Sequence, residues 1–471
     1  MTIARIPCIF LAFCCSLSIS AQKQGHIWYF GDHAGLDFNE DPPAPLLDGQ
    51  TYFPFGQGWN EGCSAISDSA GALIFYTNGR DIWNRLHEVM PNGGGLMGHP
   101  SSTQSSVIVP RPGSERFFYV FTTDALENNF LNGLRYSVVD MCLDDYKGDV
   151  LATAKNILLL STVSEKLCVV RHANNVDYWI ITHGLNSDAF YAFLLTASGI
   201  SDPVISNTGT FDVQGWGGQM VVSPNRELMA YAIPAITDAG RTLLLSFDPA
   251  TGVVSDERTL SIGGREYGVS FSPDNSKLYF STIGIGELFQ YDLNAGNLDQ
   301  IIASKTYLAA QGVDSWRQHQ LGPDGKIYIS RAVSGSLPYI EFPNEPYPEC
   351  NLVEPGVDLG GQFSSWGLPA FITGYDYSNT KLNCLLESVD APVQPEGLRI
   401  IPNPAEDFTG IALPESQRWN IVIYSASGRL VYSASSQTGV VTMNTSALDP
   451  GLYLVKVSNE RTLLSGKLVK E

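Results

Sequence analysis

The stretch SPDNSKLYFS, residues 272–281, decides the fold: a Ser-Pro-Asp turn leads into a strand in which apolar and polar residues alternate. Proline fixes φ at the second position of a type I turn, and the Asp, Asn or Gly that follows accepts the remaining geometry. Related stretches carry the same turn, and their prolines, Pro224, Pro273 and Pro323, are 49 and 50 residues apart. A strand that restarts about every fifty residues indicates a radial repeat built from small sheets.

Seven strands of this kind can be followed along the chain. The residues that mark them are, in order, Tyr29, Phe75, Tyr119, Trp179, Ala230, Tyr279 and Tyr328. Seven units of about fifty residues predict a seven-bladed β-propeller with four antiparallel strands in each blade. We expect GLPAFITG, at 367–374, to supply the inner strand that IWYFG, at 27–31, lacks. One blade then joins both ends and leaves no open sheet edge.

The composition agrees with an all-β chain and excludes one class of partner. Charged residues make up 16% and aromatic residues 11% of the 471 residues, and 45 Gly with 27 Pro favour short strands and many turns. The formal net charge is −20. A nucleic-acid-binding protein needs a basic stripe that displaces counterions from phosphates, so we expect no nucleic-acid partner.

The N-terminus is typical of a secretory signal peptide. Arg5 supplies a positive charge, residues 6–19 are mostly apolar, and small residues precede a cleavage point between Ala21 and Gln22. A lipoprotein signal is the alternative, although the bulky Phe13 stands where that motif requires a small residue. No later stretch approaches about 18 consecutive apolar residues, so we expect no transmembrane segment in the mature chain.

The expected domains are a signal peptide at 1–21, a propeller at 22–384, a linker at 385–397 and a small β-sandwich at 398–471. The linker is rich in Pro, Glu and Val, and the strands after it are separated by Asn-Pro, Ser-Gly and Asp-Pro-Gly turns. The mature chain keeps five scattered cysteines, which we expect to be buried or partly free thiols rather than a disulfide framework. Cys350 with Cys384 is the pair to test first.

Four motifs follow one another at the C-terminal end of the chain. They are IPNPA at 401–405, IYSASGRLV at 423–431, LDPGLYLVKV at 448–457 and a basic strand at 466–470. This order resembles the type A sorting domain of the type IX secretion system of Bacteroidetes. The matching positions are Pro402, Asn403, Pro404, Gly428, Gly451, Tyr453 and Lys467. Ser425 departs from the Asp or Asn that the family usually has.

This resemblance implies Sec export to the periplasm and passage across the outer membrane, with the type IX secretion machinery as partner. Removal of the tail would leave the protein secreted or attached to the cell surface. The stretches EGCSAISDSAGALIFYTNG, at 61–79, and GPDGKIYIS, at 322–330, are similar to those of flavobacterial surface propellers with TolB-type or WD-like repeats. That second resemblance implies architecture and surface location, and no settled activity.

The densest polar and aromatic cluster is formed by Trp83, Asn84, Arg85 and His87. On a strand, Trp83, Arg85 and His87 share one face, and a stacking surface with a cation and an imidazole suits a glycan or a peptide. The alternative is a blade strand whose Trp packs between sheets while the polar residues satisfy a loop. The four residues are ligand-binding candidates, although packing is the more frequent role.

His183 and His319 are two further candidates because, like His172, they lie beside expected inner strands. Their separation in the sequence is not a metal-binding pattern, so we predict no metal site. We also predict no cofactor. Acidic turns at 140–149 and 292–299 would suit Ca²⁺, and solvated turns are the simpler interpretation.

These patterns favour a non-enzymatic binding or adhesion propeller with an unknown protein or glycan ligand. The second hypothesis is a secreted hydrolase or lyase that acts on carbohydrate or peptide at the channel mouth. A carboxylate clustered with Arg85, His87, His183 or His319 at one channel entrance would favour the enzyme. We assign no catalytic residue, since neither a serine-hydrolase elbow nor a complete sialidase box is present.

Overall fold

The computed structural model divides into two compact units, Met1–Glu387 and Ser388–Glu471. The described residues are 23, 25–52, 60–208, 217–234, 240–310, 312, 316–374, 399–401, 403–405, 407–413, 418–425, 429–459 and 463–470. The expected cleavage point between Ala21 and Gln22 therefore lies outside the described residues. None of the helices in the described part of the chain is long and apolar enough to cross a membrane.

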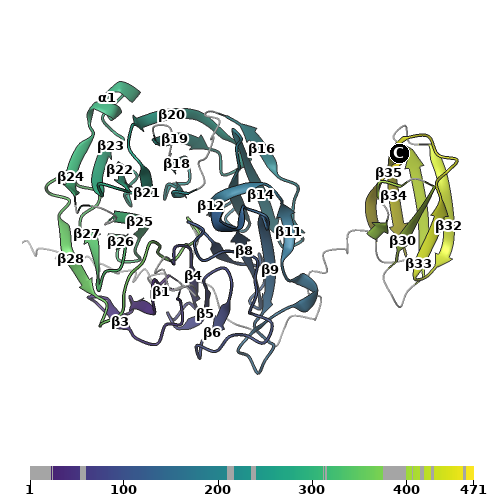
Figure 1. Ribbon diagram of the computed structural model, residues 1–471, viewed down its shortest axis with the longest axis horizontal. Coiled ribbons are helices and arrows are strands. Elements are labelled where there is room, and N and C mark those ends of the chain that lie inside the picture. The colour runs from purple at the N-terminus through teal and green to yellow at the C-terminus, as the bar shows by residue number, and fades with distance from the viewer. Residues whose placement is uncertain are drawn as a thin grey trace, which may run out of the picture. The chain divides into compact units, whose positions relative to one another are not determined.

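The first unit consists of small antiparallel sheets that follow one another around a common centre (Figure 1). Two sheets have three strands: β1 (Ile27–Phe30), β2 (Ala34–Asp37) and β3 (Ala44–Leu46), then β4 (Ser64–Ser67), β5 (Leu73–Thr77) and β6 (Ile82–Asn84). Two have five: β7 (Ser106–Pro110), β8 (Phe117–Thr123), β9 (Leu134–Asp140), β10 (Asp149–Val150) and β11 (Ile157–Leu160), then β12 (Val163–Arg171), β13 (Tyr178–Gly184), β14 (Ala189–Thr196), β15 (Gly199–Ile200) and β16 (Val204–Asn207).

Three further sheets of this unit have four strands. They are β17 (Met220–Val222), β18 (Leu228–Ile233), β19 (Arg241–Phe247) and β20 (Val254–Ile262), then β21 (Glu266–Phe271), β22 (Lys277–Thr282), β23 (Glu287–Asp292) and β24 (Thr306–Ala310), then β25 (Trp316–Leu321), β26 (Ile327–Arg331), β27 (Ser336–Ile340) and β28 (Leu352–Asp358). Short helices are η1 (Leu126–Asn128), η2 (Ala152–Ala154) and α1 (Leu298–Ala303). The all-β, propeller-like fold is confirmed, while seven as the number of blades stays a prediction.

The Ser-Pro-Asp turn joins β21 to β22 and closes through its own side chains. Ser272 Oγ donates to Asp274 Oδ1 over 2.8 Å, and the same oxygen accepts from the Ser276 amide over 2.9 Å. Asn275 has a φ of 65°, in the left-handed region that Asn tolerates better than most residues. The residue types of the repeat thus serve the backbone geometry of the turn.

The hydrophobic cores lie between neighbouring sheets. Ala230 and Leu244 from one sheet cluster with Val269, Phe271 and Phe280 from the next, and none of the five is more than 3% exposed. Burying a side chain such as Phe280 contributes about 1.5–3 kcal/mol. Packing of sheet against sheet therefore holds the ring together.

The two ends of the first unit meet, but not through the predicted shared sheet. Asp32 donates its amide to the Phe363 carbonyl over 2.8 Å, which brings the chain after β1 beside the end of the unit. Residues 367–374 form no strand of the β1 sheet. They make isolated parallel bridges instead, Pro369 with Cys63 and Thr373 with Val170, and so reach the second and fourth sheets.

Two features explain why residues 367–374, called the closing segment below, do not form a regular inner strand. Pro369 has no N–H to donate to a ladder. Gly367 lies so close to the chain before β4 that a Cβ there would be 1.3 Å from the Glu61 carbonyl oxygen. The segment still packs on the first sheet, since the Phe371 and Trp28 ring centroids are 5.8 Å apart.

The second unit is a small β-sandwich. One sheet has the order β29 (Arg399–Ile401), β30 (Phe408–Ala412) and β33 (Val440–Asn444). The other has the order β32 (Leu430–Gln437), β31 (Trp419–Ser425), β34 (Gly451–Ser458) and β35 (Leu463–Lys470). Ile411 and Met443 of the first sheet share one core with Ile421, Val455 and Leu468 of the second.

The predicted sorting motifs have structural roles in this unit. Asn403 Nδ2 donates to the Lys467 carbonyl over 2.7 Å, and Asn403 Oδ1 accepts from the Val469 amide over 2.8 Å, so Asn403 ties the first motif to the last strand. Pro404 follows it, and Gly451 begins β34. Tyr453 donates its hydroxyl to the Asp449 carbonyl over 2.7 Å. Pro402 and Gly428 lie outside the described residues.

The cysteines differ from the pair proposed for a first test. Cys63, Cys168 and Cys350 are free and buried, so Cys350 is not in a disulfide with Cys384. Cys142 is disulfide-bonded. The expectation of mostly buried free thiols is confirmed for these three residues.

Candidate functional site

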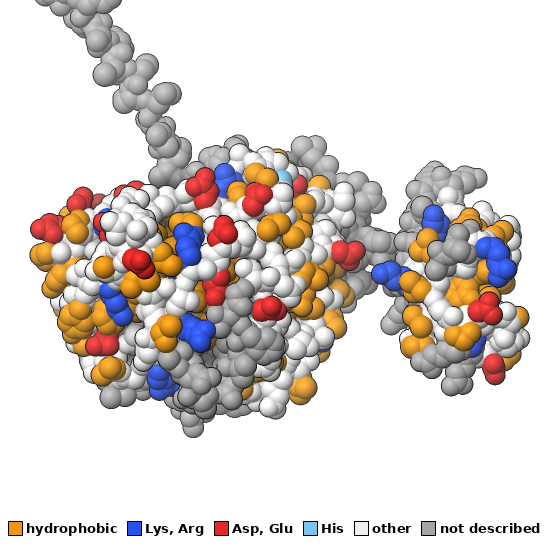
Figure 2. Space-filling model, turned by 90° about the horizontal axis from the view of Figure 1, so that it is seen from above, with side chains coloured by type: hydrophobic (Ala, Val, Ile, Leu, Met, Phe, Trp, Pro, Cys, Tyr) orange, Lys and Arg blue, Asp and Glu red, His pale blue; other side chains and the backbone are white. Residues whose placement is uncertain are grey.

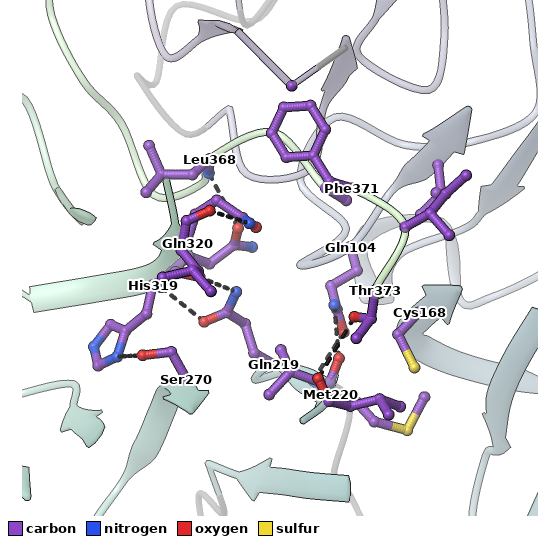
Figure 3. Close-up of a pocket in the computed structure, with 18 of the residues that line it drawn as sticks. Gln104, Cys168, Gln219, Met220, Ser270, His319, Gln320, Leu368, Phe371 and Thr373 are labelled. Carbon is purple, nitrogen blue, oxygen red and sulfur yellow. Dashed lines mark hydrogen bonds between the residues drawn. The ribbon is translucent and has the colours of Figure 1, made fainter. Parts of the chain in front are cut away.

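A cavity of about 560 Å³ lies at the centre of the first unit, where the inner strands of several sheets meet. Residues from β12, β17, β21 and β25 line it, together with the closing segment. Figure 3 shows Gln104, from the turn before β7, and Gln219, just before β17, pointing into the middle of the cavity, with Thr373 of the closing segment next to Gln104. The volume is within the range of roughly 300–1,000 Å³ that is usual for ligand sites.

Three glutamine side chains bind peptide groups around this cavity. Gln104 Nε2 donates to the Met220 carbonyl over 3.0 Å, and its Oε1 accepts from the Met220 amide over 2.9 Å. Gln219 Nε2 donates to the His319 carbonyl over 3.0 Å, and its Oε1 accepts from the His319 amide over 2.8 Å. Gln318 accepts from the Leu368 amide over 3.1 Å and donates to the Thr103 carbonyl. Side-chain amides thus tie the inner strands to one another and to the closing segment.

The described lining of the cavity contains no Asp, Glu, Lys or Arg. Its titratable side chains are His319, Cys63 and Cys168. Burial lowers the pKa of His319 to about 3 and raises the pKa of Cys168 to about 12. Burial also raises the pKa of the Cys63 thiol. The lining is therefore uncharged near neutral pH.

A cluster of ionisable side chains, Glu61, Glu165, Lys166 and Arg317, adjoins the cavity at Thr103. Thr103 Oγ1 is 2.9 Å from Glu165 Oε2 and 3.3 Å from Glu61 Oε2. Glu165 also accepts from the backbone amides of Thr103 and Leu126 over 3.0 and 3.1 Å. We call these four residues the charged cluster; none is more than 3% exposed.

Burial dominates the electrostatics of the charged cluster. It raises the pKa of Glu165 to about 7. Burial, with the nearby Glu165 charge as the second cause, raises the pKa of Glu61 well above its usual value, while the Tyr267 hydroxyl that donates to Glu61 acts in the opposite direction. Two carboxyl groups that share one hydroxyl are thus disposed to hold a proton between them.

The cations of the charged cluster lie against aromatic rings. The Arg317 guanidinium carbon is 3.9 Å from the centroid of the Trp366 ring, and Lys166 Nζ is 4.7 Å from that of Tyr231. Lys166 also donates to the Gly217 carbonyl. Segments far apart in the sequence therefore bring two carboxyl groups and two cationic side chains together here.

The predicted stretch from Trp83 to His87 does not form one strand face. β6 ends at Asn84, which accepts the amide of Leu86 over 2.8 Å, and His87 has a φ of 62°. Trp83 is 4% exposed and stacks on Tyr76. This burial agrees with the alternative interpretation, in which Trp83 packs between sheets.

The polar members of that stretch make separate contacts. Arg85 is exposed and donates to the Tyr146 carbonyl. His87 lies 3.1 Å from Asp48 Oδ2 through Nε2 and 3.1 Å from the Tyr76 hydroxyl through Nδ1. Neither residue lines the cavity. A ligand-binding role for Trp83, Asn84, Arg85 and His87 stays a prediction.

The three histidines do not meet. His319 lines the cavity, with Nδ1 3.2 Å from Ser270 Oγ (Figure 3). His183 is buried 3.2 Å from the Tyr231 hydroxyl, and His172 caps a turn by accepting the Asn174 amide. Across the described residues, no group of three His, Cys, Asp or Glu is arranged to hold a metal ion. Ligand binding by His183 and His319 also stays a prediction.

One acidic turn and the charges on one face of the first unit bear on two other expectations from the sequence. Asp140, at the start of one acidic turn, takes two bonds of 2.7 Å from the Arg116 guanidinium. In Figure 2 the Lys and Arg side chains on the visible face of the first unit lie singly among acidic ones. The expectation of no nucleic-acid partner stays a prediction.

Sequence reasoning missed both the glutamines and the charged cluster. One signal was available: Gln219 and Gln318 each precede a repeat proline, Pro224 or Pro323, by five residues, so they occupy the same position of the repeat. The convergence of Glu61 with Glu165 had no such signal, because it depends on closure of the ring.

Comparisons with known proteins identify the tail. Residues 399–471 match the model of the secretion system C-terminal sorting domain. The chain therefore carries a type IX sorting domain, and the protein is exported to the cell surface or beyond. No curated protein matches the chain.

Solved structures resemble the chain at low identity. A Bacteroides uniformis protein proposed to be a 6-phosphogluconolactonase has 13% identity and a TM-score of 0.43, over 73% of this chain and 98% of that one. A Lactobacillus plantarum protein has 13% identity and a TM-score of 0.43, over 74% and 99%. The periplasmic gluconolactonase of Pseudomonas aeruginosa has 13% identity and a TM-score of 0.35, over 75% and 95%.

Proposed function

Because the chain carries a type IX sorting domain, we propose that its first unit is an exported binding or adhesion module for protein or glycan ligands, with the central cavity as its ligand site. The observation that carries this proposal is the cavity of about 560 Å³ with an uncharged lining of amide, thiol and aromatic groups. Such a lining holds a neutral ligand by shape and hydrogen bonds. Among the described residues, the lining offers no pair of carboxyl groups for acid–base chemistry.

The proposal includes the division of the chain expected from the sequence. Residues 1–21 are a signal peptide, 22–384 the binding module, 385–397 a linker and 398–471 the sorting domain. Support comes from the two compact units and from the match of the tail. In this division the ligand site and the export signal belong to separate parts of the chain.

A hydrolase or lyase is the second candidate, and the charged cluster favours it. Glu61 and Glu165 are bridged by Thr103, and paired carboxyl groups with shifted pKa values serve as acid and base in many enzymes. Both side chains are almost fully buried and neither lines the cavity, so a substrate in the cavity does not touch them. The binding module is therefore the better supported function.

The proposal can be tested on arrays of glycans and peptides. The probe is the purified mature chain, residues 22–471. We expect saturable binding to a defined group of ligands, and no hydrolysis or elimination product after prolonged incubation with each hit. Turnover that disappears in Glu165→Gln would establish the enzyme instead. A chain that binds nothing on either array would contradict the binding module.

A further inference from the structure

The cavity wall already holds an extended peptide, which is the closing segment itself. Ala370 donates its amide to the Cys63 carbonyl over 2.9 Å. Thr373 donates to the Val169 carbonyl over 2.9 Å, and its own carbonyl accepts from the Arg171 amide over 2.9 Å. The inner edges of the second and fourth sheets thus bind extended chain through main-chain groups, as in strand addition.

The glutamines extend this recognition of peptide groups around the cavity. A primary amide matches a peptide group because each has one N–H donor side and one carbonyl acceptor. Gln104 and Gln219 each use both sides on one residue of a neighbouring inner strand, and Gln318 uses its oxygen on the Leu368 amide of the closing segment. Side-chain amides of glutamine therefore bind main-chain groups of the inner strands and also of the closing segment.

The lining also limits which side chains a ligand can carry. Transfer of a charged group from water into a site without a partner costs several kcal/mol. The described lining has no ionised side chain, whereas Phe371, Leu368 and Val221 offer apolar surface. A ligand that enters this cavity must leave its charged groups outside.

We propose that the cavity binds an uncharged, extended peptide beside the closing segment, with backbone hydrogen bonds to the inner strands. This inference rests on the proposed function, because it names the ligand class of the same site. The closing segment is the observation that favours peptide over glycan: it shows that these walls bind main chain. Apolar and small polar side chains of the ligand occupy the remaining volume.

The test uses the mature chain and a library of octapeptides built from Ala, Val, Leu, Thr, Gln, Phe and Gly, blocked at both ends. A matched library carries Glu or Lys at its centre, and a glycan array is run in parallel. We expect saturable binding of the uncharged library, and binding at least about tenfold weaker, or about 1.4 kcal/mol, for the charged library.

Two substitutions of the same kind locate the binding. Gln320 is half-buried and lines the cavity, whereas Gln362 is half-buried outside it. Gln320→Trp fills part of the cavity and should weaken peptide binding at least about tenfold, while Gln362→Trp should leave it unchanged. Thermal unfolding of both variants establishes that they fold.

The unmodified chain provides a second readout of location. Cys168 lines the cavity, whereas Cys350 is a free buried thiol elsewhere, and burial raises the pKa of both. Bound peptide should slow maleimide labelling of Cys168 and leave that of Cys350 unchanged, as measured by mass spectrometry. This comparison decides the matter if Gln320→Trp does not fold.

The outcomes separate this inference from the proposed function. Glycan binding alone, lost in Gln320→Trp, overturns the peptide inference and leaves the binding module standing. Peptide binding that ignores Gln320→Trp and does not protect Cys168 overturns the location. Binding to neither array overturns the proposed function as well.

Discussion

Replacement of Glu165 by Gln tests how burial controls the charged cluster. In the folded chain the pKa of Glu165 is raised from 4.5 to about 7, with burial as the main cause. This rise in the pKa corresponds to a difference of about 3 kcal/mol between the contributions of the protonated and the ionised carboxyl group to stability. The side chain is fully buried, so solvent does not screen this effect.

The raised pKa of Glu165 determines how the stability of the fold changes with pH. A carboxyl group whose pKa is raised on folding favours the folded state when it is protonated. Its contribution is complete below about pH 4.5 and is lost as the pH rises through about 7. The unmodified chain should therefore lose about 3 kcal/mol of stability from this group between pH 4.5 and 8.

Glu165→Gln removes this dependence because an amide does not titrate. The Gln side chain has one acceptor oxygen, whereas Glu165 accepts from the amides of both Thr103 and Leu126. One donor then faces an NH₂ group, which costs about 1–3 kcal/mol at every pH. The variant should be less stable at pH 4.5, and the difference should shrink or reverse at pH 8.

Urea unfolding followed by tryptophan fluorescence at pH 4.5, 6 and 8 measures the difference between the two chains. Glu40→Gln, at an exposed position, is the control for loss of one carboxyl group. It should give a curve parallel to that of the unmodified chain. Parallel curves for Glu165→Gln would refute the reasoning from burial.

Three further predictions concern export, ring closure and a buried ion pair. Deletion of 399–471 should retain the protein in the periplasm, and undiminished surface immunolabelling of intact cells would contradict the role of the tail. Gly367→Ala should lower the free energy of unfolding by about 1–3 kcal/mol, since its Cβ would lie 1.3 Å from a backbone oxygen. A Cβ at Gly335 would meet only the Gln362 carbonyl oxygen at 4.0 Å, so Gly335→Ala should change little in the same urea assay. Arg116→Ala should cost about 3–5 kcal/mol, because it leaves the buried Asp140 carboxylate without its two 2.7 Å bonds; a loss below about 1 kcal/mol would contradict this.

The fold was largely predictable because its signals are local. The Ser-Pro-Asp turn closes through contacts within five residues, so the repeat prolines locate the strands without knowledge of the ring. The sorting domain was predictable for a similar reason. Its motifs are short and follow one another in order, and Asn403 of the first motif is hydrogen-bonded to the last strand.

The closing segment was harder to predict because its contacts depend on ring closure. It was expected to supply the inner strand that the first sheet lacks, but Pro369 and the tight approach of Gly367 are accompanied by bridges to Cys63 and Val170 instead. Burial of His183 beside Tyr231 likewise had no local signal.

The site followed the same rule. Glu61 and Glu165 come together only when the ring closes, and no spacing in the sequence announces their shared contact with Thr103. The stretch from Trp83 to His87 attracted notice through its residue types, yet β6 ends at Asn84 and the polar side chains diverge. The residue types alone could not show whether these side chains share one face, because that depends on where the strand ends.

A crystal structure of the mature chain with the ligand that it binds most tightly on the arrays shows whether the central cavity is the ligand site. We expect ligand density inside the cavity, between Gln219, Gln320 and Phe371, with no charged ligand group among these side chains. Density confined to the outer rim of the ring, with the central cavity empty, would contradict it.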